Sequence, residues 1–468
     1  MDKKMSIKEN DKNGVEANGH VKNSSNMQKE SKQALPQRKV YTHRNSVLTD
    51  LMEVNHLQTV YNISVAVCTL LLINAAIYYL SEPEMFWKDT LIMRWAVSKL
   101  DLFVGIWILL QLFAYFIYAG FTLWLQLRNR IFTKVIDFLF LSLFIVSIGL
   151  LYTLTPYTVL RNNIPPITGF AIVAEQVRIF MKVYSFVRET APRAMKYKPS
   201  KDGNQLHSII PSLRHYTYFL FIPAFIFRES YPRTKEIRWR VIVYNIFKFF
   251  SCIFITYCVF MRFNVDIFKS TGLKPFRPSE AALTLAGAMV VGSMMMFLIF
   301  YGILHCWLNI FAELLRFGDR EFYQDWWNST SFSQYYRRWN TVVYDWLYNY
   351  VYIDTHKMGC SKSFSLVLVF VVSALVHEYV ISMGLGFCYP VLMVIYSTIG
   401  VLVVFLTQSR TSQFWNTFMW SMLFSGWGII ISLYSSEWYA RVNCPQKLDS
   451  KWDFFIPRSW DSSCRILL

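Results

Sequence analysis

The chain has 468 residues, of which 54% are hydrophobic, 18% aromatic and only 16% charged. An ordinary soluble domain carries about 25% charged residues, so this composition excludes a string of soluble domains. The formal net charge of +17 would suit a nucleic-acid-binding protein. The basic residues, however, collect in the segments between long apolar runs, which indicates membrane orientation instead.

The N-terminal segment, residues 1–45, is polar and rich in Lys, Asn, Ser and Gln. We expect no secretory signal peptide here, because no apolar core follows the charged start. The composition is typical of a disordered segment. We therefore predict a disordered cytosolic tail over 1–45 and a membrane domain over 46–468.

Long apolar segments fill the rest of the chain, and crossing a bilayer takes about 20 residues of helix. They predict an all-α, polytopic protein with about nine spans. The fourth span is ambiguous, because Glu175, Arg178 and Lys182 line one helical face. That pattern suits either an interfacial helix or a span that faces an aqueous cavity. The predicted spans are about 57–80, 102–127, 133–156, 166–187, 240–262, 281–311, 363–387, 389–409 and 413–436.

The basic residues predict how the spans are oriented. With nine spans and a cytosolic N-terminus, the cytosolic segments hold most of the Lys and Arg residues, as the positive-inside rule requires. The C-terminus is then lumenal. Cys444 and Cys464 share a polar segment there, and an oxidising compartment would permit a disulfide between them. Two unpaired thiols are the alternative.

Residues 316–362 form a cytosolic segment that is unusually rich in Trp and Tyr. Such rings belong at a membrane interface or around a ligand with an apolar chain and a polar head. Arg337, Asn340 and Tyr344 follow a spacing of i, i+3 and i+7, with Tyr336 four residues before Asn340. A continuous helix would place a cation, an amide and two phenols on one face. The aromatic content alone favours an interfacial aromatic belt over a ligand site.

Residues 363–379 form an apolar run that contains His377 and Glu378. An ionisable side chain at membrane depth is costly unless it faces a cavity or a partner, so it indicates a functional site. Ser373 lies one helical turn before His377, which aligns a hydroxyl with the imidazole. No His or Cys lies three or four residues from His377, so we predict no metal site.

Two alternatives to a catalytic His377 stay open. A single buried histidine is often a packed, hydrogen-bonded residue. A rival stripe, His305, Asn309 and Glu313, also lies at membrane depth. Such a stripe could be catalytic, but regular polar stripes more often join helices to one another.

Several motifs resemble the membrane-bound O-acyltransferase superfamily, and within it the sterol O-acyltransferases (acyl-CoA:cholesterol acyltransferases). They are FYQDWWN, the Trp339–Asn340 pair and SALVHEY over Ser373–Tyr379. Further agreement covers the chain from about Leu48 onward, including SSEWYAR and PRSW near the C-terminus. In FYQDWWN the characteristic residues are Phe322, Tyr323, Asp325, Trp326, Trp327 and Asn328.

The resemblance implies transfer of a long-chain acyl group from acyl-CoA to the hydroxyl of cholesterol or a related sterol. It implies a multi-pass protein of the endoplasmic reticulum that forms a homo-oligomer, a dimer or tetramer, with acyl-CoA as co-substrate and no cofactor. His377 matches the catalytic histidine and Asn340 the second essential residue. The family usually has His where this chain has Tyr344. The other positions implied are Gln334, Arg337, Tyr352, Lys362 and Ser373 for acyl-CoA, His56 for the sterol, and Cys444 with Cys464 as a lumenal disulfide.

The residue chemistry agrees with these roles. An imidazole acting as general base on a sterol hydroxyl is worth roughly 10²–10⁴-fold. Asn340 can donate to a developing oxyanion, while Lys362 and Arg337 can meet the phosphates of CoA. Ser373 as a covalent acyl carrier is a minor alternative.

Two other functions remain in competition. Diacylglycerol acyltransferases share FYxDWWN, although Tyr379 after His-Glu and the EWYAR sequence favour the sterol branch. A lipid transporter or channel would use buried polar residues as gates or relays. Against it, the chain shows no internal repeat.

Overall fold

The computed structural model describes residues 39–128, 132–196, 210–273, 277–444, 446 and 451–460. Across these residues the regular elements are all helices, supplemented by two isolated β-bridges, Arg44–Asp319 and Arg233–Phe317. Residues 39–468 form one compact unit. The predicted all-α class is confirmed.

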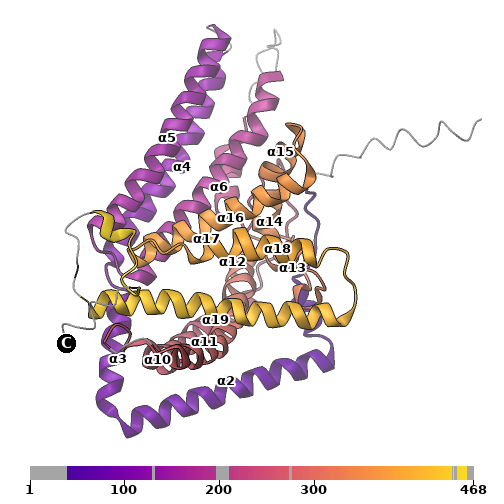
Figure 1. Ribbon diagram of the computed structural model, residues 1–468. Helices are drawn as coiled ribbons and strands as arrows, with labels where there is room; N and C mark the ends of the chain where they lie inside the picture. Colours follow the sequence, from indigo (N-terminus) through magenta and orange to yellow (C-terminus); the bar gives the residue numbers. More distant parts are fainter. Residues whose placement is uncertain are drawn as a thin grey trace, which may run out of the picture. The chain divides into compact units, whose positions relative to one another are not determined.

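Figure 1 shows the order of the helices along the chain. In chain order they are α1 (Val47–Leu51), α2 (Asn55–Ser81), α3 (Pro83–Ala96), α4 (Leu100–Arg128), α5 (Thr133–Arg161), α6 (Pro166–Lys196), α8 (Leu213–Phe221), α9 (Trp239–Val259), η1 (Phe260–Val265), α10 (Asp266–Phe268), α11 (Pro278–Ile299), η2 (Phe300–Trp307), α12 (Leu308–Leu314), η3 (Trp326–Asn328), α13 (Phe332–Trp339), α14 (Thr341–Leu347), η4 (Tyr348–Tyr352), α15 (Ile353–Lys357), α16 (Lys362–Leu385), α17 (Val391–Val394), η5 (Ile395–Gly400), α18 (Val401–Leu406), α19 (Gln413–Asn443) and η6 (Lys451–Phe454).

Among the described residues, seven helical segments are long and apolar enough to cross a membrane. Two of the nine predicted spans are not in this set. Helix α6 carries too many charges, and the stretch predicted over 389–409 begins its helix only after Pro390 and is a shorter apolar helix, Val391–Leu406. The seven segments are Asn55–Ser81, Pro83–Arg128, Thr133–Arg161, Trp239–Phe268, Pro278–Leu314, Lys362–Leu385 and Gln413–Asn443.

The charged stripe of α6 faces protein rather than lipid or an aqueous cavity. The Nζ group of Lys182 is buried and donates to three carbonyl oxygens at the end of α8, those of Phe219 at 2.5 Å, Ile222 at 2.7 Å and Ala224 at 2.8 Å. Arg178 pairs with Glu175 at 2.6 Å. The stripe thus binds the free carbonyl groups that every helix C-terminus leaves.

Helices α11 and α19 lie side by side (Figure 1), and glycines allow their close approach. A Cβ atom on Gly428 would lie 2.8 Å from the Cα of Met289, and one on Gly292 would lie 3.0 Å from the carbonyl oxygen of Trp427. Small residues at a helix crossing let the backbones approach closely inside a membrane. Each helix therefore supplies one glycine to the same contact.

The segment Lys39–Ser46, which we call the strap, is bound to the rest of the unit. Arg44 forms a two-point ion pair with Asp319, at 2.7 and 3.1 Å, and a further pair with Glu321 at 2.8 Å. Lys39 pairs with Asp345 at 2.9 Å. Residues 39–45, assigned above to the tail, therefore belong to the folded unit, which begins at Lys39. The carboxylates that hold them lie more than two hundred residues away, beyond the reach of local composition.

The strap ends in a buried polar cluster. The Oγ of Ser46 lies 3.3 Å from Nδ1 of His305 and accepts a hydrogen bond from Nδ2 of Asn309 at 3.3 Å. The same His305 nitrogen lies 2.7 Å from the hydroxyl of Tyr323. One turn on, Glu313 pairs with Arg238 at 2.9 Å. The rival polar stripe of the sequence analysis thus joins chain segments together.

Candidate active site

Helix α16 carries His377. It begins after Ser361, whose side chain accepts from the N–H of Phe364, and it ends at Gly386 in the left-handed conformation, φ 76°. Nδ1 of His377 lies 2.7 Å from the carbonyl oxygen of Ser373 and 3.4 Å from its hydroxyl. The carbonyl, rather than the hydroxyl expected from the sequence, is therefore the closer partner.

This contact decides which imidazole nitrogen is basic. A carbonyl oxygen only accepts hydrogen bonds, so Nδ1 must carry the proton that it donates to Ser373. In a neutral imidazole the other nitrogen, Nε2, then holds the lone pair. The side chain of His377 is exposed, and Nε2 is its one nitrogen with the chemistry to accept a proton.

An aromatic ring from another element lies against this histidine and is packed in turn on a second ring. The ring of Tyr396, on η5, lies 5.8 Å from the imidazole at an interplanar angle of 65°. Tyr396 also contacts Tyr336 of α13, which packs edge-on against Phe370 of α16. Sequence reasoning missed Tyr396; its signal was a phenol inside an otherwise apolar stretch.

Asn340 lies at a break between two helices, so the continuous helical face predicted for Arg337, Asn340 and Tyr344 is wrong. Helix α13 ends at Trp339, and Asn340 adopts φ −144° and ψ 88°. Its Oδ1 accepts a hydrogen bond from the N–H of Val343 at 3.2 Å. Asparagine is among the preferred N-caps because its side chain replaces a missing helical partner. The Nδ2 group takes no part in this cap.

The FYQDWWN motif builds the platform beneath Asn340. The buried Trp326 packs against Phe300 and Trp339, with ring centroids 5.1 and 4.7 Å away. Asp325 pairs with Arg338 at 3.2 Å, and the carbonyl of Phe322 accepts from the N–H of Thr341 at 3.0 Å. These contacts bracket Asn340 on both sides. The motif residues act through packing and backbone bonds that fix the α13–α14 junction.

A stacked aromatic ladder runs from α14 through η4 to α15. Tyr344 stacks on Tyr348, Tyr348 on Tyr352, and Tyr352 on His356, with centroids 5.6, 5.3 and 6.3 Å apart. The i, i+4 spacing of these residues places them on one helical face. Burial raises the pKa of Tyr344 to about 12. This phenol therefore stays protonated at neutral pH.

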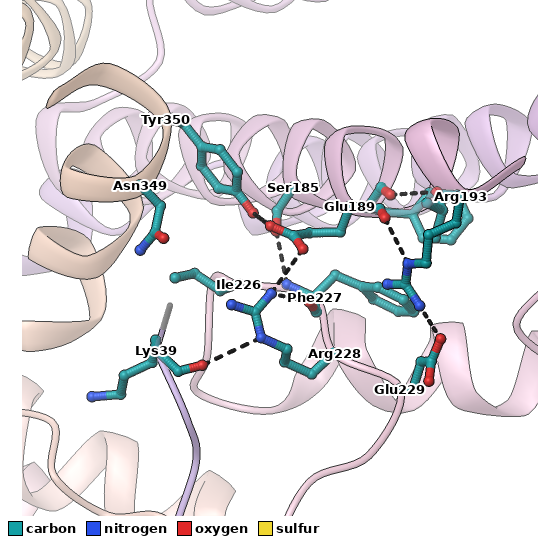
Figure 2. Close-up of polar contacts among 12 residues, drawn as sticks. Lys39, Ser185, Glu189, Arg193, Ile226, Phe227, Arg228, Glu229, Asn349 and Tyr350 are labelled. Atoms are coloured by element: carbon teal, nitrogen blue, oxygen red, sulfur yellow. Dashed lines mark hydrogen bonds and ion pairs between the residues drawn. The ribbon is translucent and has the colours of Figure 1, made fainter. Parts of the chain in front are cut away.

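A polar network anchors η4 to other segments of the same chain. Figure 2 shows Arg228 between the carboxylate of Glu189, 2.9 Å away, and the carbonyl of Lys39 in the strap, 3.3 Å away. The hydroxyl of Tyr350, on η4, lies 3.0 Å from Glu189 and 2.8 Å from Ser185 on α6. The ladder is thereby held by α6 and by the strap together.

The remaining predicted residues occupy separate places. Gln334 is used locally, accepting from the N–H of Thr330 at 3.2 Å. Arg337 is exposed on α13, and Lys362 is the exposed first residue of α16. His56 is exposed on α2, which packs against α3 and α9.

The other predictions on cysteines and metals stay open. Cys444 is buried at the end of α19, but Cys464 lies outside the described residues, so their pairing remains a prediction. In the described part of the chain no three His, Cys, Asp or Glu side chains are grouped as metal ligands would be. The absence of a metal site also stays a prediction. A cavity of about 210 Å³ lies elsewhere, lined by the strap residues His43 and Arg44 and by Arg238 and Arg320 among others.

Comparison with known proteins gives concordant matches. Residues 152–436 match the model of the membrane-bound O-acyltransferase family. The chain is 38% identical over 442 residues to sterol O-acyltransferase 1 of Mus musculus, covering 92% of this chain and 80% of that protein. It is 38% identical over 432 residues to sterol O-acyltransferase 2 of Homo sapiens, covering 91% and 81% of the two chains.

Proposed function

The chain belongs to the membrane-bound O-acyltransferase family, and from that premise we propose that it transfers a long-chain acyl group from acyl-CoA to the hydroxyl of a sterol such as cholesterol. The products are a sterol ester and free CoA. The observation that carries this proposal is the geometry of His377, whose Nδ1–H is held by the Ser373 carbonyl while Nε2 stays free. The printed names of the relatives supply the substrate class.

His377 acts as the general base in this reaction. Nε2 takes the proton of the sterol hydroxyl as its oxygen attacks the thioester carbon. Fixing the tautomer by a backbone bond holds the lone pair in one direction, which a general base requires. The imidazolium that forms then returns the proton to the sulfur of CoA as the C–S bond breaks. The acyl group thus ends on the sterol oxygen, and the proton of the sterol hydroxyl ends on the CoA thiol.

Asn340 supplies the donor for the developing oxyanion. Its Oδ1 is occupied by the α14 cap, which holds the amide in one orientation and leaves Nδ2–H to donate. A preorganised donor aimed at the developing charge stabilises the transition state without further reorganisation. The platform built by Trp326 and Trp339 keeps this junction rigid.

The CoA moiety is proposed to bind along the cytosolic segment. The ladder residue Tyr352, the exposed cations Arg337 and Lys362, and Gln334 offer stacking, charge and hydrogen bonding to an adenine nucleotide. Ser373 lies beside the acyl carbonyl, and His56 lies toward the sterol. Acyl-CoA is the co-substrate, and the chemistry needs no other cofactor.

The protein is a multi-pass membrane protein, and we place it in the endoplasmic reticulum with the N-terminus cytosolic and the C-terminus lumenal. The distribution of basic residues supports this orientation. A homo-oligomer, dimer or tetramer, is proposed from the resemblance alone.

The direct test uses the purified protein in lipid nanodiscs with radiolabelled oleoyl-CoA and either cholesterol or diacylglycerol. We expect labelled cholesteryl ester and release of CoA in proportion to added sterol. Labelled triacylglycerol would instead identify a diacylglycerol acyltransferase. Absence of CoA release with either acceptor, in folded protein, would contradict an enzyme and favour lipid transport.

A further inference from the structure

Glu378, the residue after His377, is buried and accepts hydrogen bonds from three directions. Its Oε2 accepts from the backbone N–H groups of Leu392 at 3.0 Å and Met393 at 3.2 Å. The hydroxyl of Tyr434 on α19 donates to the same oxygen at 2.8 Å, and Ser382 donates to Oε1 at 3.3 Å. The two backbone N–H groups can only donate and the two hydroxyls are able to donate, so the Glu378 carboxyl group serves as the acceptor that joins these segments.

The two backbone donors belong to the first turn of the apolar helix Val391–Leu406. The first N–H groups of a helix lack partners within it, and a carboxylate placed there also interacts favourably with the helix dipole. Glu378 therefore caps this helix from a different one. It attaches the start of Val391–Leu406 to the middle of α16.

The cap determines where Tyr396 lies. Leu392 and Tyr396 are separated by four residues and so lie on one face of their helix, one turn apart. Their partners on α16, Glu378 and His377, are adjacent in sequence. Consecutive residues of α16 thus engage consecutive turns of the second helix. The turn that carries Tyr396 is π-helical, Ile395–Gly400, an irregularity that is frequent at functional sites.

We propose that Glu378 is a positioning residue for the acyl transfer: by capping helix Val391–Leu406 it sets that helix in register with α16, so that the ring of Tyr396 covers one side of the His377 imidazole. Tyr396 closes that side of the ring, edge-on at 5.8 Å between ring centroids. This inference rests on the proposed function for its catalytic meaning. The geometry itself is open to a separate test.

The first test measures covering of His377 without using activity. Full-length protein in nanodiscs is treated with diethylpyrocarbonate, and the labelling rate of each histidine is followed by mass spectrometry. We expect Glu378→Gln and Tyr396→Ala to label faster at His377 than wild type, with His356 unchanged as internal reference. Tyr396→Phe keeps the ring and should label as wild type does.

The matched control is Glu437→Gln. Glu437 lies on a different helix, α19, and is buried like Glu378. Its carboxylate also accepts hydrogen bonds from two backbone N–H groups, those of Arg458 and Ser459, at 2.9 Å each. The Glu437→Gln variant should unfold at a lower temperature than wild type, but its His377 should react with diethylpyrocarbonate at the wild-type rate. Unchanged labelling in Glu378→Gln, or an equal increase in Glu437→Gln, would overturn the positioning role.

The second test is a double-mutant cycle on the acyl-transfer kinetics. Displacing a group beside the reacting atoms by about 1 Å can cost roughly 10²-fold in rate, so Glu378→Gln should lower kcat by about that factor with KM for acyl-CoA unchanged. Because Glu378 acts through Tyr396, the loss should largely disappear in the Tyr396→Ala background. Additive losses, or a change confined to KM, would contradict the proposal. Ester formation that survives His377→Ala would instead refute the general-base role of His377, and a wild-type protein that forms no ester would refute the proposed function. Either outcome leaves the labelling result standing.

Discussion

Oδ1 of Asn340 accepts a hydrogen bond from the N–H of Val343 at 3.2 Å, which makes Asn340 the N-cap of α14. The same side-chain amide is the proposed donor to the oxyanion. Its two functional atoms serve two separate purposes. Oδ1 holds the start of α14, and Nδ2 is the proposed donor to the oxyanion. Substitutions can therefore separate stability from catalysis at one position.

Asn340→Asp should fold normally and lose activity. The carboxylate keeps an acceptor for the Val343 N–H and suits a helix N-terminus, but it has no hydrogen to donate and repels an oxyanion. We expect kcat to fall by roughly 10²–10³-fold while the unfolding temperature holds. Asn340→Gln keeps an amide donor in a displaced position and should lose less activity. Equal and mild losses in both variants would mean that Asn340 only caps the helix.

His377→Ala should abolish ester formation with little change in stability. The side chain is exposed, whereas the general-base contribution is worth roughly 10²–10⁴-fold. Initial rates and thermal unfolding in the same detergent measure both quantities. His305→Ala is the paired control, because His305 is buried against Tyr323 and Ser46. His305→Ala should lower the free energy of unfolding by roughly 1–3 kcal/mol, and the activity per folded molecule should stay at the wild-type level. Activity lost in folded His305→Ala but kept in His377→Ala would reverse the assignment.

Arg44→Ala should loosen the strap. Asp319 is almost fully buried, and losing its ion-pair partner costs roughly 1–3 kcal/mol because Arg44 itself is partly exposed. Limited proteolysis near residue 44 and thermal unfolding measure the effect. Adding Asp319→Asn should recover part of the loss by removing the unpaired charge. Arg277→Ala, at an exposed pair with Glu280, should change stability by no more than about 0.5 kcal/mol. Equal effects at both arginines would refute a structural strap.

Gly428→Ala should destabilise the α11–α19 crossing. The added methyl group would meet the backbone of Met289 at 2.8 Å, so the helices must separate. Overpacking of this kind costs roughly 1–3 kcal/mol. Gly426→Ala on the same helix has open space around its Cβ and should be neutral or slightly stabilising, because alanine favours helix. The measurement is the unfolding temperature of the two variants under the same conditions. Equal unfolding temperatures would exclude a close helix contact at Gly428.

The membrane helices and the central histidine were predictable from local sequence. Long uncharged runs must become helices because a bilayer leaves every backbone polar group to be satisfied internally. His377 stood out because an ionisable group at membrane depth is costly. The family resemblance rested on contiguous motifs, and the comparisons confirm it over nine tenths of the chain.

Other features depended on residues far apart in the chain, so only the tertiary structure decided them. The strap is held by partners 275 residues away, and the α6 stripe by carbonyl groups of α8, which no periodicity reveals. The helix break at Asn340 reflects the platform that FYQDWWN builds around it, a constraint stronger than helical spacing. Tyr396 reaches His377 because Glu378 caps a second helix. Local sequence specifies which segments become helices, and long-range hydrogen bonds and ion pairs specify which of their faces meet.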